Sequence, residues 1–240
     1  ALARVALATL AAQSGDLDRA EEELVQALAA EGSADTYALA HFHLARLRAG
    51  RSEEELARRH LETALELAPG FVEARLARAD LELAAGRFAD AARRFGRLAE
   101  QRPDLVAAHT GRALALLESG RHLEARRLLE AAWRDLPEAL TVGHLLARVL
   151  ATAPAPRVRD SRRAIDLAAS LFERQPSLPH GETVAMALAA AGRYDEAVTW
   201  QRRLIDEARS GGAPPETVAR LESRLAEYQR GQAPRDAWRL

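Results

Sequence analysis

The chain has 240 residues, of which 48% are hydrophobic and 29% charged, and its formal net charge is −1. A charge so close to zero creates no overall field that would attract nucleic acid or a membrane surface. The sequence contains no cysteine, which excludes disulfides and thiolate metal sites, and no run of about 18 uncharged apolar residues predicts a membrane span.

Two helical hairpins are predicted at the start of the chain. The first covers residues 1–32, has its turn at Gly15 and lacks a closing proline. The second covers residues 34–69 and has a longer turn, RAGRSEEELA. Glycine ends a helix because it adopts the left-handed conformation. Pro69 ends the second hairpin because proline cannot continue the hydrogen-bond ladder of a helix.

The next two hairpins, residues 71–103 and 105–137, repeat one pattern. Their turns lie at Gly86 and Gly120, and their ends at Pro103 and Pro137, each 34 residues apart. A fixed period of this length indicates stacked copies of one helical hairpin.

Two longer units complete the stack. The fifth hairpin, residues 138–176, is extended by the loop ATAPAPRVRD, and the sixth, residues 178–210, turns at Gly192. Residues 214–231 form an amphipathic helix that would cap the last hairpin, and residues 232–240 form a tail. We therefore expect one solenoid over residues 1–231.

Small residues are predicted where the two helices of a hairpin cross, because small side chains let the helices approach closely. In the first helices these are Ala8, Ala45, Ala79, Ala113, Ala147 and Ala185. In the second helices they are Ala20, Ala57, Ala91, Ala125, Ala164 and Ala197. A single hairpin cannot bury its apolar face, so stability must come from stacking.

This pattern resembles the tetratricopeptide repeat, which also has 34 residues, in its small residue, turn glycine, second alanine and closing proline. It departs from that family at Arg75 and His109, where a large aromatic residue is usual. The resemblance implies an all-α, right-handed superhelical solenoid with a C-terminal capping helix. From residue 145 onward the chain looks like the carboxy-terminal repeat region of a bacterial multi-repeat protein, which implies a further portion before residue 1.

The resemblance also implies that the first helix of each hairpin lines a concave groove. An apolar peptide or partner helix would lie there, with His144 and Arg148 as polar anchors. The groove residues expected on this basis are Val5, Phe42, Leu76, Asp80, Leu83, Thr110, Leu114, Leu117, His144 and Arg148. The family's clamp for peptide carboxylates uses lysine and asparagine, and this chain has neither.

Two further segments are candidate contacts. Arg157 and Arg159 in the long loop would suit a phosphate or an acidic peptide, although the loop would equally serve to bridge two helices. Trp238 in the tail would either anchor a partner or pack back on the last helix.

No catalytic, cofactor-binding or metal-binding residue is predicted. Without lysine there is no nucleotide-binding P-loop, and HExxH is absent. His41 and His43 stand two residues apart, about 200° around a helix, so they cannot readily share an ion.

The predicted function is a non-catalytic protein–protein interaction scaffold that binds a peptide or partner protein in its groove. Its partners would be proteins, or other subunits of a larger complex, with no nucleic acid and no membrane insertion. The alternative is an accessory arm of a larger enzyme or redox protein whose active domain lies before residue 1. We expect a soluble protein of the bacterial cytoplasm or periplasm, and the sequence does not distinguish these compartments.

Overall fold

The computed structural model describes residues 1–235 and 237–238, and every regular element in them is a helix. This confirms the all-α prediction. The chain divides into two compact units, Ala1–Pro103 and Asp104–Leu240. Within the described residues, no helix is both long enough and apolar enough to cross a bilayer.

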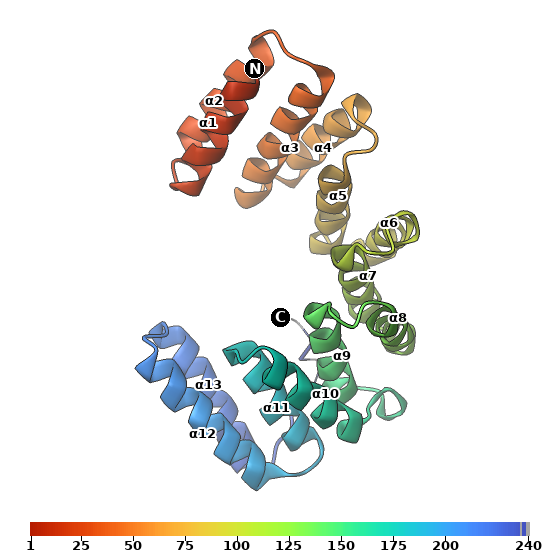
Figure 1. Cartoon of the computed structure of the whole chain (residues 1–240), viewed down its shortest axis with the longest axis vertical. Coiled ribbons are helices and arrows are strands. Elements are labelled where there is room, and N and C mark those ends of the chain that lie inside the picture. Colours follow the sequence, from red (N-terminus) through yellow and green to blue (C-terminus); the bar gives the residue numbers. More distant parts are fainter. Residues whose placement is uncertain (236, 239–240) are drawn as a thin grey trace. The chain divides into compact units, whose positions relative to one another are not determined.

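The first unit contains three helical hairpins. Their helices are α1 (Leu2–Gln13) with α2 (Leu17–Ala29), α3 (Ala34–Gly50) with α4 (Glu54–Leu67), and α5 (Val72–Ala84) with α6 (Phe88–Gln101) (Figure 1). Within each pair the two helices pack against each other, and the first helices are also in contact, α1 with α3 and α3 with α5. The first helices therefore form one face of this unit.

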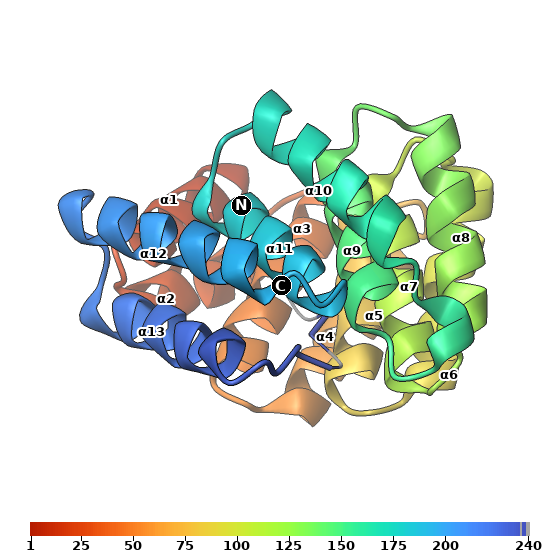
Figure 2. The ribbon, with the colours of Figure 1, turned by 90° about the horizontal axis from the view of Figure 1, so that it is seen from below.

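The second unit contains three more hairpins and one further helix. Its helices are α7 (Val106–Glu118), α8 (His122–Asp135), α9 (Leu140–Thr152), α10 (Ser161–Arg174), α11 (Leu178–Ala190), α12 (Tyr194–Ser210) and α13 (Pro215–Gln229). Figure 2 shows α13 lying beside α12, in the position predicted for the capping helix. The predicted tail includes residues 236, 239 and 240, which lie outside the described residues.

The alanines expected at the helix crossings are buried. All twelve expose 2% of their surface or less; examples are Ala45 and Ala57, which face each other's helices in the second hairpin. A larger side chain at these positions would push the helices apart, because protein interiors are packed at crystal density. The twelve alanines thus lie in buried contacts, where the sequence pattern places them.

The turns within the hairpins follow the glycine prediction at four positions. Gly15, Gly86, Gly120 and Gly192 all have positive φ, between 73° and 83°. The second hairpin differs, because its left-handed residue is Ser52, with φ of 61°. A side chain in this conformation costs about 1–2 kcal/mol relative to the right-handed one, so this turn is the strained one.

The long loop between α9 and α10 is folded against its neighbours. It contains a short 3-10 helix, η1 (Pro156–Val158), whose Val158 is only 1% exposed. The Arg126 side chain on α8 donates a hydrogen bond to the Val158 carbonyl at 3.0 Å. Asp160 then caps α10 by accepting from the Arg163 backbone amide at 3.1 Å.

A polar pair lies inside the second unit, between α9 and α11. His144 is 6% exposed, and its Nε2 atom lies 2.7 Å from the Thr183 hydroxyl. Thr183 donates its single hydroxyl hydrogen to the Pro179 carbonyl at 3.0 Å, so it must accept from His144. Burial, followed by the charges of Arg148 and His180, lowers the pKa of His144 to about 4. His144 is therefore neutral in the folded protein.

The helix crossing at Ala91 gives a first prediction. Replacing Ala91, which is 0% exposed, by tryptophan should destabilise the first unit by about 1–3 kcal/mol or more, because the core cannot accommodate the added volume. The control is Ala89→Trp, two residues away on the same helix at an exposed position. Melting followed by circular dichroism should show a large drop for Ala91→Trp only. Equal melting temperatures would contradict the packing described.

The neutral His144 gives a second prediction. His144 takes up a proton near pH 6.5 in the unfolded chain and only near pH 4 in the folded chain. The free energy of unfolding therefore has its full value above pH 6.5 and decreases as the pH is lowered from 6.5 to 4. The loss should reach roughly 3 kcal/mol at pH 4. Unfolding followed by tryptophan fluorescence reports the second unit, which contains Trp133, Trp200 and Trp238. His144→Gln should flatten this pH dependence; an unchanged slope would refute the assignment.

Candidate functional site

The first unit has a hollow between α3 and α5, on the face formed by the first helices. Its volume is about 410 Å³. It is lined by Phe42, Ala45, Arg46, Ala49, Leu61, Glu73, Leu76, Ala77, Asp80, Leu81 and Ala84. Three predicted groove residues, Phe42, Leu76 and Asp80, thus come together in one place.

A second hollow, of about 430 Å³, lies between the first hairpin and α3. Thr9 and Leu17 of the first hairpin contribute to its wall, together with Leu47 of α3. Arg46 lines both hollows, so the two are neighbours along α3. We call the two hollows together the unit-1 groove.

The walls of the unit-1 groove combine apolar side chains with a few charges. The Phe42 ring packs on the Phe71 ring with a centroid distance of 5.1 Å, and the Arg46 guanidinium carbon lies 5.9 Å from the Phe42 centroid. Asp80 is exposed, but the groups around it partly exclude water and raise the pKa of its carboxyl. The groove can therefore hold an apolar segment. The Asp80 carboxyl can also accept a hydrogen bond from that segment or pair with a positively charged group on it.

The other predicted groove residues are distributed differently. Val5 and Leu117 lie in the core, each 1% exposed, so they pack hairpins together and offer no surface. Leu83, Thr110 and Leu114 are half-buried. The repeat position of each of these residues predicts that it lines the groove. The repeat position alone, however, does not distinguish side chains on the groove surface from side chains buried beneath it.

At α9 the predicted anchors are engaged within the chain. His144 is buried against Thr183, as described above. The Nε atom of Arg148 donates to the Ala237 carbonyl at 2.8 Å, and the Ala237 amide donates to the Thr152 hydroxyl at 3.2 Å. A backbone segment of the tail is thus held by two side chains one turn apart on α9.

Trp238, next in the tail, is 5% exposed. Its indole nitrogen donates to Glu118 at the end of α7, at 3.3 Å, and its ring lies 5.2 Å from the ring of His122 at the start of α8. Of the two sequence interpretations, packing back on the chain describes Trp238 in this structure, although it packs on α7 and α8 and not on α13. After α13 the chain runs back toward α9 (Figure 2).

The two arginines of the long loop, Arg157 and Arg159, have different surroundings. Arg159 donates to the carbonyls of Ala153 and Pro154, each at 2.9 Å, and so it holds its own loop in shape. Arg157 is exposed. Only Arg157 of this pair presents its guanidinium to solvent.

Two histidine contacts were missed from the sequence. His41 and His60 lie across the second hairpin with their Nδ1 atoms 3.0 Å apart, and the His144 and His180 rings lie 4.9 Å apart. Burial lowers the pKa of both His41 and His60. Both residues of the first pair lie on the two helices of one hairpin, but His41 is 11 residues before Ser52 and His60 is 8 after it, so their spacing from the turn does not predict the contact. No set of three metal-ligating side chains gathers anywhere in residues 1–235 and 237–238.

Residues 76–139 match the family model described as tetratricopeptide repeat. A search of curated proteins finds no match.

Solved structures of tetratricopeptide repeat (TPR) proteins have the same fold. A TPR protein from Parabacteroides merdae aligns with a TM-score of 0.68 and 18% identity, over 93% of this chain and 83% of its own. A thermophilic TPR protein of Thermus thermophilus aligns with a TM-score of 0.61 and 17% identity, over 80% and 99%. YrrB, described as a TPR protein with an unusual peptide-binding site, aligns with a TM-score of 0.51 and 16% identity, over 70% and 85%. Residues 76–139 therefore match the tetratricopeptide-repeat family, and the chain has the fold of the tetratricopeptide-repeat proteins to which it is similar.

Proposed function

We propose that this chain is a non-catalytic interaction scaffold that holds an apolar segment of a partner protein in the unit-1 groove. The observation that carries the proposal is the hollow between α3 and α5, where Phe42 and Leu76 expose apolar surface beside Asp80. An apolar hollow with a few placed polar groups is the usual form of a binding site. Two adjacent hollows suit an extended or helical segment better than a compact small molecule.

The TPR fold supports a binding role in general, since repeat stacks present extended surfaces to other proteins. YrrB has this fold, and its peptide-binding site is a property of that protein. For this chain we infer a partner segment with one or more apolar side chains and a basic or hydrogen-bonding group placed near Asp80.

The tail of the second unit offers an internal example of how such a stack holds a peptide. Arg148 and Thr152 bind one carbonyl and one amide of the tail, while the Trp238 side chain is buried nearby. Backbone hydrogen bonds provide affinity, and a buried side chain provides specificity. We infer that the surface of α7, α8 and α9 recognises an extended segment containing tryptophan, and that the tail is its resident occupant.

The groove proposal predicts the effect of a charge at its centre. Peptides selected from a random library on the intact chain should bind Leu76→Glu at least tenfold more weakly, because a carboxylate would be placed in the apolar hollow next to Asp80. The matched control is Leu56→Glu, since Leu56 is 42% exposed on α4, away from the groove. Fluorescence anisotropy of labelled peptides gives both affinities. Peptides that bind both variants as tightly as the unmodified chain would refute the groove.

The resident tail makes a separate prediction. A chain shortened to residues 1–231 should bind a synthetic peptide of residues 232–240, and the full chain should bind it much more weakly, because its own tail competes at high effective concentration. Replacing the tryptophan of that peptide by alanine should abolish most of the binding. Isothermal titration calorimetry measures this directly. Equal binding by the shortened and full chains would contradict the inference.

A further inference from the structure

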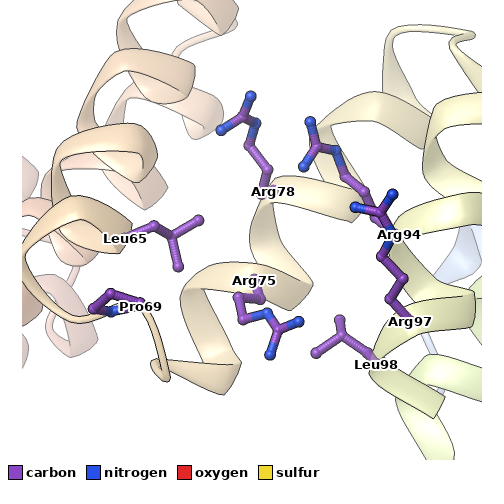
Figure 3. Close-up of a pocket in the computed structure, with 7 residues that line it drawn as sticks. All are labelled: Leu65, Pro69, Arg75, Arg78, Arg94, Arg97 and Leu98. Carbon is purple, nitrogen blue, oxygen red and sulfur yellow. The ribbon is translucent and has the colours of Figure 1, made fainter. Parts of the chain in front are cut away.

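The first unit contains another cavity, separate from the unit-1 groove, between α4 and α6 and over α5. Its volume is about 300 Å³, and its walls include Leu65, Pro69 and Leu98. Four arginines line it, Arg75 and Arg78 from α5 and Arg94 and Arg97 from α6. Figure 3 shows the guanidinium groups of Arg78, Arg94 and Arg97 gathered on one side of the cavity, with Arg75 below them. We call these four residues the arginine cluster.

Helix geometry separates the cavity from the groove. Arg75 and Arg78 stand three residues apart and therefore share one face of α5. Asp80 stands two residues after Arg78, about 200° around the helix, and lines the groove instead. One helix thus presents carboxylate to the groove and guanidinium to the cavity.

The positive charges of the arginine cluster are only partly compensated. Arg78 forms an ion pair with Glu62 at 2.9 Å, and Arg75 hydrogen-bonds to the neutral side chain of Gln101 at 2.6 Å. The nearest carboxylate oxygen to Arg94 belongs to Glu82, at 3.8 Å. Arg97 is exposed and has no ion pair or hydrogen bond with any residue in the described part of the chain. The cavity therefore carries an excess of positive charge.

Two donors in the cluster are buried without an acceptor. The Nε atoms of Arg78 and Arg94 are inaccessible to water and donate no hydrogen bond, since the Glu82 oxygen is 3.8 Å from each of them. Glu82 itself hydrogen-bonds to Arg87. A buried donor left unpaired costs about 1–3 kcal/mol, and more when it is charged. Burial and then the charge of Arg78 lower the pKa of Arg94, which is the direction expected for a cation short of negative partners.

We propose that the arginine cluster binds a phosphoryl group. Several guanidinium groups around one small cavity match a tetrahedral dianion, because a phosphate monoester carries a charge near −1.5 to −2 and three strong acceptor oxygens. A carboxylate supplies one charge and two oxygens, which is too little for four cations. Arginine suits this role because its planar fork donates paired hydrogen bonds to phosphate. Leu65, Pro69 and Leu98 add apolar walls to the cavity, and a charge interaction is stronger beside apolar groups than in open water.

The same chemistry has two sources, free phosphate and a phosphorylated side chain of a peptide. Isothermal titration calorimetry of the full chain at constant ionic strength should use inorganic phosphate, acetate, and a pair of identical short peptides with phosphoserine or serine. Phosphate and the phosphoserine peptide should bind, and acetate and the serine peptide should bind at least tenfold more weakly. A phosphopeptide tenfold tighter than phosphate identifies a modified partner; similar affinities identify the free anion.

Variants of one helix provide the controls. Arg94→Gln should weaken phosphate binding at least tenfold, and Arg97→Gln severalfold. Arg97 is exposed, so its replacement keeps the fold intact. The matched control is Arg93→Gln, because Arg93 neighbours Arg94 but has a side chain 70% exposed and paired with Asp90. This control should bind phosphate as the unmodified chain does.

A thermal measurement gives an independent readout. Without phosphate, Arg97→Gln should melt at the same temperature as the unmodified chain or slightly higher, since one like charge is removed, and its stabilisation by phosphate should be smaller. Phosphate binding no tighter than acetate binding, or unchanged in both Arg94→Gln and Arg97→Gln, would overturn the proposal. Because Leu76→Glu leaves the cluster intact, loss of groove binding and loss of phosphate binding are distinguishable.

Discussion

The close approach of paired helices is the constraint on which every surface of this chain depends. Alanine occupies each crossing, from Ala8 with Ala20 to Ala185 with Ala197, and all are at most 2% exposed. Because the two helices of a hairpin are nearly in backbone contact, each hairpin is thin and stacks on the next. The stack then separates two faces, one made by first helices and one by second helices. In the first unit, the groove lies on one face and the arginine cluster on the other.

Ion pairs between successive hairpins recur with the period of the repeat. Arg51 pairs with Asp18, Arg87 with Glu54, and Arg163 with Glu130, in each case between second helices or turns 33 residues apart. Exposed pairs of this kind contribute little to stability individually, but they neutralise the arginines of successive hairpins. The arginine cluster departs from this arrangement, since Arg94 and Arg97 have no carboxylate within hydrogen-bond distance in the described part of the chain. This departure from a regular pattern is what distinguishes a site from a solvated face.

Local features of the fold could be predicted from the sequence because the repeat encodes them directly. Gly86 and Gly120 have the positive φ that their position demands, and the capping helix follows from its amphipathic pattern. Ser52 shows where the pattern fails, because no glycine marks the strained residue of that turn. Val5 and Leu117 are buried, although their positions in the repeat predict that they line the groove. The arginine cluster and the His41–His60 contact depend on how neighbouring helices pack, and a 34-residue period does not specify side-chain contacts between helices.

The return of the tail changes how the second unit can open. In a repeat stack each hairpin normally touches only its neighbours, so the end hairpin can detach while the others remain folded. Trp238 hydrogen-bonds to Glu118, 120 residues earlier in the chain, and Ala237 binds two side chains of α9. Detaching α13 would therefore pull on contacts at the opposite end of the same unit. These contacts between the tail and α7 to α9 make the opening of the second unit more concerted than a linear stack allows.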